Sequence, residues 1–183
     1  MLNAAGIDPA QVNSVPRTDF SNDPLINGQV DAMDAFVVNQ PVQLNQQGHQ
    51  VNAIMAADYG IDVYANIIFT SEEKIANNPE LIERFLRATL QGMQDAVNNP
   101  EEAANLAVQY NPELSLESEI ESMRRGLPLV DPAGSRPGMM TDENWQIAHE
   151  ILVQQDILAE SFQIESAYTL TFLEKVYNQL AAK

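Results

Sequence analysis

The stretch of sequence that decides the fold is residues 28–44, which read Gly-Gln-Val-Asp-Ala-Met-Asp-Ala-Phe-Val-Val-Asn-Gln-Pro-Val-Gln-Leu. A short apolar run, residues 32–37, is followed closely by a segment with the pattern of a helix, residues 40–47. Pro41 suits the first turn of that helix, because a proline there removes no hydrogen bond that the helix needs. A strand-like run that leads into a helix is typical of α/β folds.

The same alternation continues on both sides of this stretch. The short apolar runs, each long enough for one strand, are residues 12–15, 32–37 and 51–55. The helical segments between and beside them are residues 23–29 and 40–47. Strands that are separated by helices of this length usually lie parallel in one sheet. Residues 11–55 are therefore predicted to be α/β.

A further strand is predicted over residues 65–70, which read Ala-Asn-Ile-Ile-Phe-Thr. It ends at Ser71, whose hydroxyl can cap the helix that follows, and the acidic Glu72 and Glu73 suit a helix N-terminus. From there on the pattern predicts one helix after another. Helices are predicted to begin at Pro79, Asn99-Pro100, Ser115 and Thr141, and a last helix covers residues 170–180, whereas residues 127–140 are predicted to be a loop because they are rich in proline and glycine.

The charge of the chain excludes several classes of partner. The sequence has 26 acidic and 9 basic residues, and the formal net charge of −17 would repel nucleic-acid phosphates and anionic lipid. The acidic residues are spread along helical segments, which is typical of solvated faces. Because the sequence contains no cysteine, disulfides and thiolate metal sites are excluded. Because of the negative net charge, we expect no nucleic acid as a partner.

The sequence also bears on location. No apolar stretch is long enough to span a bilayer. Residues 1–10 lack the features of a secretory signal and resemble the end of a helix that runs into a turn. The chain is therefore expected to begin inside a fold, with any export signal upstream of it.

Signatures of catalysis are missing from the sequence. The two histidines, His49 and His149, have no metal-ligand spacing. There is no His-Glu-x-x-His motif, no glycine-rich phosphate loop and no Gly-x-Ser-x-Gly motif. We predict no catalytic residue, no metal ligand and no cofactor, and we expect a binding protein rather than an enzyme.

The first candidate binding residues lie where the apolar run 32–37 ends. Asp34-Ala35-Phe36 closes this run and leads to Asn39-Gln40-Pro41. Ligands of open α/β sheets bind outside the carboxyl ends of the strands, where a helix start also offers free amide groups. We therefore expect Phe36, Asn39 and Gln40 to contact a ligand. In the alternative interpretation Asn39 only caps the helix.

A second candidate group follows at Asp58-Tyr59-Gly60 and Asp62-Val63-Tyr64. Two tyrosines and two carboxylates in a short connection offer a stacking surface and hydrogen-bond acceptors, which suit a planar, polar or cationic solute. We expect Asp58, Tyr59 and Tyr64 to contact the ligand, and the alternative is a turn with a packed tyrosine. Arg136 could pair with an anionic ligand, although a lone arginine is more often a surface residue.

Several motifs, taken in chain order, resemble those of one family of binding proteins. They are Gly28-Gln29-Val30-Asp31-Ala32, Asn39-Gln40-Pro41-Val42-Gln43-Leu44, Asp58-Tyr59-Gly60, Asn-Pro-Glu-Leu-Ile-Glu-Arg-Phe-Leu-Arg-Ala-Thr at 78–89, and Asn99-Pro100-Glu101-Glu102-Ala103. They resemble the periplasmic substrate-binding proteins of ABC transporters that bind thiamine pyrimidine precursors, with alkanesulfonate- and riboflavin-binding relatives. The resemblance covers nearly the whole chain.

This resemblance implies a type II periplasmic-binding-protein-like α/β fold, in which two lobes close over a solute. Residues 1–62 would form the C-terminal half of the second lobe, residues 63–70 the strand that crosses the hinge, and residues 71–183 the helical segment that packs on the first lobe. Because the sheet of the first lobe is absent from the chain, apolar surface would need cover, which favours a homodimer or strand exchange.

The same resemblance implies a function and a location. The protein would capture a small organic solute and present it to an ABC permease in the membrane. It would lie in the periplasm, or outside the cell with a membrane anchor. A ligand-sensing domain of a signalling protein is an alternative, because such folds also occur fused to membrane kinases.

Two departures from the family pattern bear on the ligand and on the chemistry. Members of the family usually have Asn-Glu-Pro where this chain has Asn39-Gln40-Pro41, so a carboxylate that could hold an aminopyrimidine is replaced by a neutral amide. A fungal enzyme of the same fold makes the thiamine pyrimidine with a cysteine-rich motif that corresponds to residues 61–65. This chain has no cysteine there, which argues against the enzyme.

Overall fold

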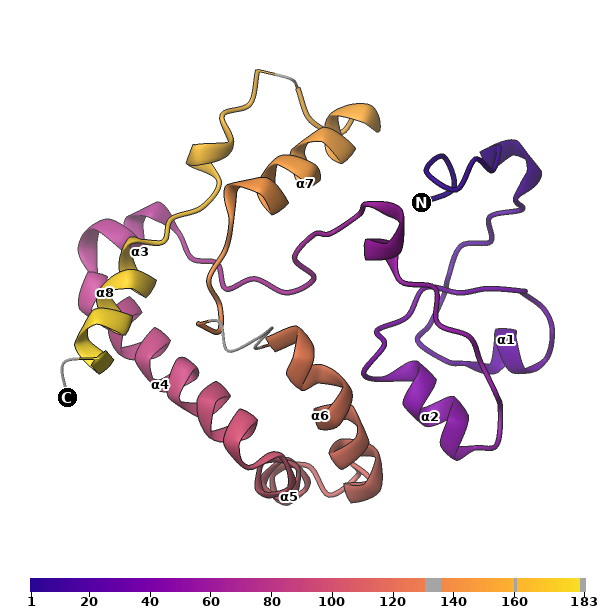
Figure 1. The fold of residues 1–183 in the computed structure, drawn as a ribbon, viewed down its shortest axis with the longest axis horizontal. Helices are drawn as coiled ribbons and strands as arrows, with labels where there is room; N and C mark the ends of the chain where they lie inside the picture. The colour runs from indigo at the N-terminus through magenta and orange to yellow at the C-terminus, as the bar shows by residue number, and fades with distance from the viewer. Residues whose placement is uncertain (131–135, 160, 182–183) are drawn as a thin grey trace. The chain divides into compact units, whose positions relative to one another are not determined.

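The computed structural model describes residues 1–130, 136–159 and 161–181, and Figure 1 shows their path. Within these residues the regular structure is helical, and no strand is formed. The contacts divide the chain into two compact units. Unit 1 comprises Met1–Met55 with Asp95–Ala133, and unit 2 comprises Ala56–Gln94 with Gly134–Lys183.

The helices begin close to the residues predicted from the sequence. Unit 1 contains η1 (Pro9–Gln11), α1 (Asp23–Ile26), α2 (Gln40–Gln46), α5 (Pro100–Tyr110) and α6 (Leu116–Val130). Unit 2 contains η2 (Ala56–Tyr59), α3 (Glu72–Asn77), α7 (Asp142–Gln154), η4 (Ile164–Ser166) and α8 (Thr171–Ala181). Helix α4 (Pro79–Asn98) begins in unit 2 and ends in unit 1. The predicted helix starts after Ser71, Asn78, Asn99, Ser115 and Thr141 are confirmed.

Side-chain caps set where two helices of unit 2 begin. The hydroxyl of Ser71 accepts a hydrogen bond from the amide of Lys74 at 3.2 Å at the start of α3. The hydroxyl of Thr141 accepts one from the amide of Asn144 at 3.3 Å at the start of α7. Each bond satisfies an amide that the helix itself leaves without a partner.

Helix α2 ends at a glycine. The amide of His49 donates to the carbonyl of Leu44 at 2.9 Å, which closes the last turn. This closure requires a residue with positive φ between them, and Gly48 has φ +87°. The end of α2, the helix that carries Gln40, is therefore fixed by local sequence.

The packing of unit 1 holds α2 against α6, and α6 against α5 (Figure 1). Val42 and Leu44 of α2 and Ala104 of α5 are buried. Gly126 of α6 comes close to the segment before α2, because a Cβ atom at this position would lie 3.5 Å from Cγ1 of Val38. These contacts hold the N-terminus of α2 in place.

The packing of unit 2 centres on α4 and α8, which lie side by side (Figure 1). Leu90 of α4 and Leu173 and Val176 of α8 are buried together. Partly buried side chains surround them: Leu86, Met93, Met139, Leu170, Tyr177 and Leu180. An ion pair between Lys175 and Glu83 also joins the two helices. The predicted helix over residues 170–180 is therefore confirmed and forms half of this core.

The strands predicted over residues 12–15, 32–37, 51–55 and 65–70 are not formed. A strand is held by backbone hydrogen bonds to a neighbour. Within the described part of the chain, no backbone hydrogen bond joins residues 62–70 to another segment. The side chains of Ile67, Ile68 and Phe69 are exposed. A strand requires both an apolar pattern and a neighbouring strand to pair with. These segments have the pattern, but the pattern does not specify the neighbouring strand.

The loop predicted over residues 127–140 is wrong for its first four residues, which are helical. Helix α6 continues to Val130 with Pro128 inside it. Because a proline has no amide hydrogen, Pro128 cannot donate to the carbonyl of Arg124, and the hydrogen-bond ladder of α6 lacks this one bond near its C-terminus. Residues 131–135 lie outside the described residues.

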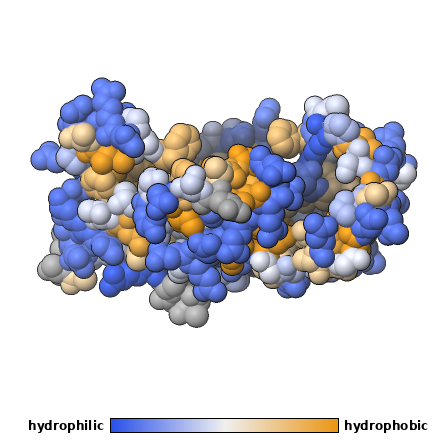
Figure 2. All heavy atoms as spheres, turned by 90° about the horizontal axis from the view of Figure 1, so that it is seen from above, coloured by the Kyte–Doolittle hydropathy of each residue, from blue (hydrophilic) through white to orange (hydrophobic). Residues whose placement is uncertain are grey.

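The face seen in Figure 2 is mostly hydrophilic, with several separate apolar patches. This distribution agrees with the 26 acidic residues of the chain. Among the described residues, no helix has both the length and the apolar character that a membrane crossing requires.

Candidate ligand-binding site

A pocket of ≈ 350 Å³ lies in unit 1 beside the N-terminus of α2. This volume is within the range of small-molecule sites in proteins. The pocket is lined by aromatic, amide and charged side chains from two stretches of the chain: Arg17, Phe20, Asp34, Ala35, Phe36, Asn39, Gln40 and Gln43. The structure thus brings together Phe36, Asn39 and Gln40, the first group of residues predicted from the sequence.

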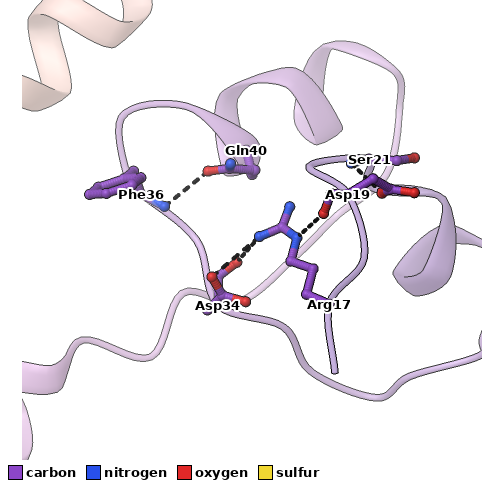
Figure 3. Close-up of polar contacts among 6 residues, drawn as sticks. All are labelled: Arg17, Asp19, Ser21, Asp34, Phe36 and Gln40. Carbon is purple, nitrogen blue, oxygen red and sulfur yellow. Dashed lines mark hydrogen bonds and ion pairs between the residues drawn. The ribbon is translucent and has the colours of Figure 1, made fainter. Parts of the chain in front are cut away.

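Arg17 is held at the pocket by hydrogen bonds to two neighbours (Figure 3). Its Nε donates to the carbonyl of Asp19 at 2.7 Å. Its Nη1 donates to the carbonyl of Asp34 at 2.9 Å and lies 3.3 Å from the carboxylate oxygen Oδ2 of Asp34. The remaining nitrogen, Nη2, is buried and has no partner. Two nitrogens of the guanidinium are therefore held by hydrogen bonds, and the third has no hydrogen-bond acceptor.

Gln40 ties the N-terminus of α2 to the segment before it. Its Oε1 accepts a hydrogen bond from the backbone amide of Phe36 at 2.9 Å (Figure 3). Because a backbone amide can only donate, this bond fixes which end of the Gln40 side chain is the oxygen. Gln40 is buried, whereas the side chain of Phe36 is half-exposed. The pocket thus has an ordered amide and an aromatic ring that is free to pack on a ligand.

Asn39 occupies the position before α2, but its side chain does not cap the helix. Its Oδ1 instead accepts a hydrogen bond from Nε2 of Gln43 at 2.7 Å, one turn further along. Asn39 therefore occupies the N-cap position, as the alternative interpretation predicted, but its side chain makes no capping hydrogen bond. Asn39 and Gln43 line the pocket as a linked pair of amides.

Arg17, Phe20 and Gln43 line the pocket but were not among the predicted binding residues, and of these Arg17 and Phe20 lie outside every motif quoted from the sequence. Both residues come before the first of these motifs in the chain. In the structure, the carbon at the centre of the Arg17 guanidinium lies 5.4 Å from the centre of the Phe20 ring. One signal was available, because Arg17 is the only lysine or arginine in residues 1–73. A single cation in a long acidic stretch is a candidate for a specific role.

The second predicted group, Asp58, Tyr59 and Tyr64, belongs to unit 2. Asp58 and Tyr59 lie in η2, and the ring of Tyr59 is partly exposed. The hydroxyl of Tyr64 accepts a hydrogen bond from the amide of Thr141 at 2.8 Å. Its ring lies 6.2 Å from that of Trp145. Through these two contacts Tyr64 joins residues 61–70 to the start of α7.

Aromatic and polar groups pair with one another around α7. The rings of Trp145 and Tyr168 stack with their centres 4.8 Å apart. The hydroxyl of Tyr168 donates to the carboxylate of Asp142. This hydrogen bond, with smaller contributions from burial and nearby negative charge, raises the pKa of Tyr168 to about 12. Tyr168 therefore stays protonated well above neutral pH.

Of the other residues singled out by the sequence, His49 belongs to unit 1, and His149 and Arg136 belong to unit 2. His149 lies within α7, as predicted, and both of its ring nitrogens are buried without a hydrogen-bond partner. The guanidinium carbon of Arg136 lies 5.2 Å from the centre of the Tyr177 ring. Within the described residues, no three His, Cys, Asp or Glu side chains come together as a metal site would require.

A pocket lined by aromatic and amide side chains at a helix start is typical of a protein that binds a small molecule. The family model described as NMT1/THI5 like matches residues 1–103, which is more than half of the chain. The chain therefore belongs to the NMT1/THI5-like family, and this membership implies the periplasmic-binding-protein-like fold. The resemblance found in the sequence motifs is confirmed.

Three curated relatives align with most of the chain. The riboflavin-binding protein RibY of Chloroflexus aurantiacus is 32% identical over 181 residues, which cover 94% of this chain and 50% of the relative. The formylaminopyrimidine-binding protein of Halalkalibacterium halodurans is 27% identical, with 92% and 53% covered. The 4-amino-5-hydroxymethyl-2-methylpyrimidine phosphate synthase of Legionella pneumophila is 28% identical, with 94% and 54% covered. The chain thus spans about half the length of the curated relatives it matches.

Proposed function

We propose that this chain is part of the extracytoplasmic solute-binding component of an ABC importer, which captures a small organic solute and delivers it to a membrane permease. Two relatives are named as binding proteins, one for riboflavin and one for formylaminopyrimidine. The observation that carries the proposal is the pocket at the N-terminus of α2, which coincides with the Asn39-Gln40-Pro41 motif. The solute would be a heterocycle of the thiamine-precursor kind or a related compound.

In this proposal Phe36 packs on the face of the solute, while Asn39 and Gln40 orient it by hydrogen bonds. The exposed part of the Phe36 ring is available for such packing. Asp58, Tyr59 and Tyr64 remain predicted ligand contacts of the second group. Of these, Tyr59 has its ring partly exposed, which supports a contact, whereas the hydroxyl of Tyr64 already accepts a hydrogen bond.

We further propose that residues 1–62 are part of one lobe, that residues 63–70 cross the hinge, and that residues 71–183 belong to the other lobe. The exposed apolar side chains of Ile67, Ile68 and Phe69 support a paired role for the crossing segment. A homodimer or strand exchange would supply the neighbouring strand. Sedimentation velocity over a range of concentrations tests this: dimers that Phe69→Lys abolishes support it, and a monomer at all concentrations contradicts it.

The test of solute binding is a thermal-shift screen of the protein with riboflavin, formylaminopyrimidine, thiamine and alkanesulfonates. A ligand that binds the folded state only, at a hundred times its Kd, stabilises the protein by about 2.7 kcal/mol. A clear shift with one solute supports the proposal, and no shift with any of them contradicts it. Asn39→Ala and Tyr59→Ala should each weaken binding, while Tyr110→Ala, a substitution at an exposed tyrosine, should not.

The second candidate function is an enzyme of pyrimidine synthesis. The relative from Legionella pneumophila, which is named as a synthase, is the observation that favours it. The test is an activity assay with iron and pyridoxal phosphate. Formation of the pyrimidine product would favour the enzyme over the binding protein, and no product under conditions where a solute binds would favour the binding protein.

A further inference from the structure

Arg17 presents a buried and unpaired hydrogen-bond donor at the pocket. Its Nε and Nη1 are used by Asp19 and Asp34, but Nη2 has no partner. A buried donor on a charged group that lacks an acceptor is costly, and in native proteins such a group is usually satisfied by water or by a ligand. The side chain is only 22% exposed and is fixed by its other bonds, so Nη2 cannot turn freely into solvent.

The charge of this cation is already balanced. The carboxylate of Asp34 lies 3.3 Å from Nη1 and is 83% exposed, so it keeps lone pairs for a further partner. Residues 1–55 contain five aspartates and no other lysine or arginine. An anionic ligand would therefore meet a site without net positive charge. The pair is suited to a neutral ligand that accepts from Arg17 and donates to Asp34.

Gln40 contributes a second donor. Because its Oε1 accepts from the amide of Phe36, the group left for a ligand is the NH₂ of the side chain. This donor belongs to the same pocket as Arg17 and Asp34.

We propose that Arg17, Asp34 and Gln40 recognise a neutral planar ring that carries an N–H group flanked by two carbonyl groups, which is a cyclic imide. This inference rests on the proposed function and names the ligand class of the same pocket. The two carbonyl oxygens accept from Nη2 of Arg17 and from the amide of Gln40, and the ring N–H donates to the carboxylate of Asp34. The rings of Phe20 and Phe36 pack on the flat ligand.

Other ligand chemistries match this set of groups less well. Along the edge that carries its amino group, an aminopyrimidine offers one donor beside one ring-nitrogen acceptor, so this edge satisfies Asp34 and one donor and leaves the other donor without a partner. A sulfonate offers acceptors only, and its negative charge faces the carboxylate of Asp34. An unpaired polar group in a binding site lowers affinity strongly, so the pocket should discriminate among the three.

The experiment is calorimetric titration of the protein with four probes: riboflavin, which carries the imide edge, 3-methylriboflavin, in which a methyl group replaces the imide hydrogen, formylaminopyrimidine and butanesulfonate. Arg17→Gln and Asp34→Asn test the two charged partners. Arg124→Gln is the matched control, because Arg124 is an exposed arginine of the same unit that lies 3.7 Å from Glu101. Circular dichroism establishes that each variant is folded.

We expect riboflavin to bind most tightly, 3-methylriboflavin and the Arg17→Gln variant to show losses of about ten-fold or more, and Asp34→Asn a loss of about five-fold. The control should stay within about two-fold of the unsubstituted protein. If Arg17→Gln does not fold, the methylated probe and Asp34→Asn decide the question.

Two kinds of result overturn the inference and leave the proposed function standing. One is tighter binding of formylaminopyrimidine or butanesulfonate than of riboflavin. The other is equal binding of riboflavin and its 3-methyl derivative together with no loss in the variants. Absence of binding with all four probes contradicts the inference and counts against the proposed function as well.

Discussion

The pocket of unit 1 and the paired helices α4 and α8 of unit 2 use their side chains in different ways. Around α4 and α8 the buried residues are aliphatic, as Leu90, Leu173 and Val176 illustrate. Around the pocket, polar side chains are fixed by bonds on one side and open on the other, as Arg17 and Gln40 illustrate. Stability is therefore expected to depend most on the helix pair, and recognition on residues 17–43.

The largest expected effect is on the helix pair. Leu90→Ala should lower the free energy of unfolding by about 3 kcal/mol, because a large aliphatic side chain is removed from a buried site. Leu81→Ala, in the same helix but exposed, should cost less than about 1 kcal/mol. Urea unfolding followed by circular dichroism measures both. Equal losses would mean that α4 is not buried at Leu90.

Smaller changes in the free energy of unfolding, with opposite signs, are expected when two glycines of unit 2 are replaced by alanine. A Cβ atom at Gly138 would lie 3.7 Å from Leu90, which leaves room for a methyl group. However, Gly138 has φ +80°, so the backbone of Gly138→Ala would be strained. It should destabilise by about 1–2 kcal/mol. Gly92 lies inside α4 with nothing near its added Cβ, and Gly92→Ala should stabilise by about 0.5–1 kcal/mol. Thermal melting gives both signs, and a gain in both variants would contradict the left-handed conformation.

A third effect on stability is expected when the hydroxyl of Tyr64 is removed. Tyr64→Phe removes the acceptor for the amide of Thr141 and should destabilise by about 1 kcal/mol. Tyr110→Phe, at an exposed site, is the control and should change nothing measurable. The comparison is made by thermal melting. If Tyr64→Phe melts like the original protein and instead loses ligand affinity, Tyr64 is a binding residue rather than a structural one.

The smallest effect is a change in the pH dependence of stability. The pKa of Tyr168 is raised from its ordinary value of 10.0 to about 12 by its hydrogen bond to Asp142. The protonated form is favoured in the folded state, so this contribution is fully present below pH 10 and is lost as the pH rises through 12. Tyr168→Phe should lack this loss. Identical alkaline melting profiles for both proteins would exclude the contribution.

Much of the helical structure could be predicted because it depends on neighbours in the chain. The capping hydroxyls of Ser71 and Thr141 lie three residues from the amides they satisfy. The prolines at positions 79 and 100 begin helices for an equally local reason. The strand over residues 65–70 could not be judged in this way, because a strand depends on a partner that its own sequence does not specify.

The candidate site was predictable in part for the same reason. Phe36, Asn39 and Gln40 lie within five consecutive positions, so a helix start brings them to one place. Arg17 reaches the same pocket from a distant position in the chain. Its bond to Asp34 spans 17 residues that include the short helix α1, and no single periodicity describes this stretch.

The sequence by itself determined where most of the helices begin, the net negative charge, the family and the residue types at the start of α2. These follow from local hydrogen bonds, from composition and from motifs in fixed order. Only the tertiary structure decided that Arg17 joins the pocket with one nitrogen unpaired and that the hydroxyl of Tyr64 is used to hold α7. The physical reason is that both depend on where distant segments meet, which is a property of packing rather than of local sequence.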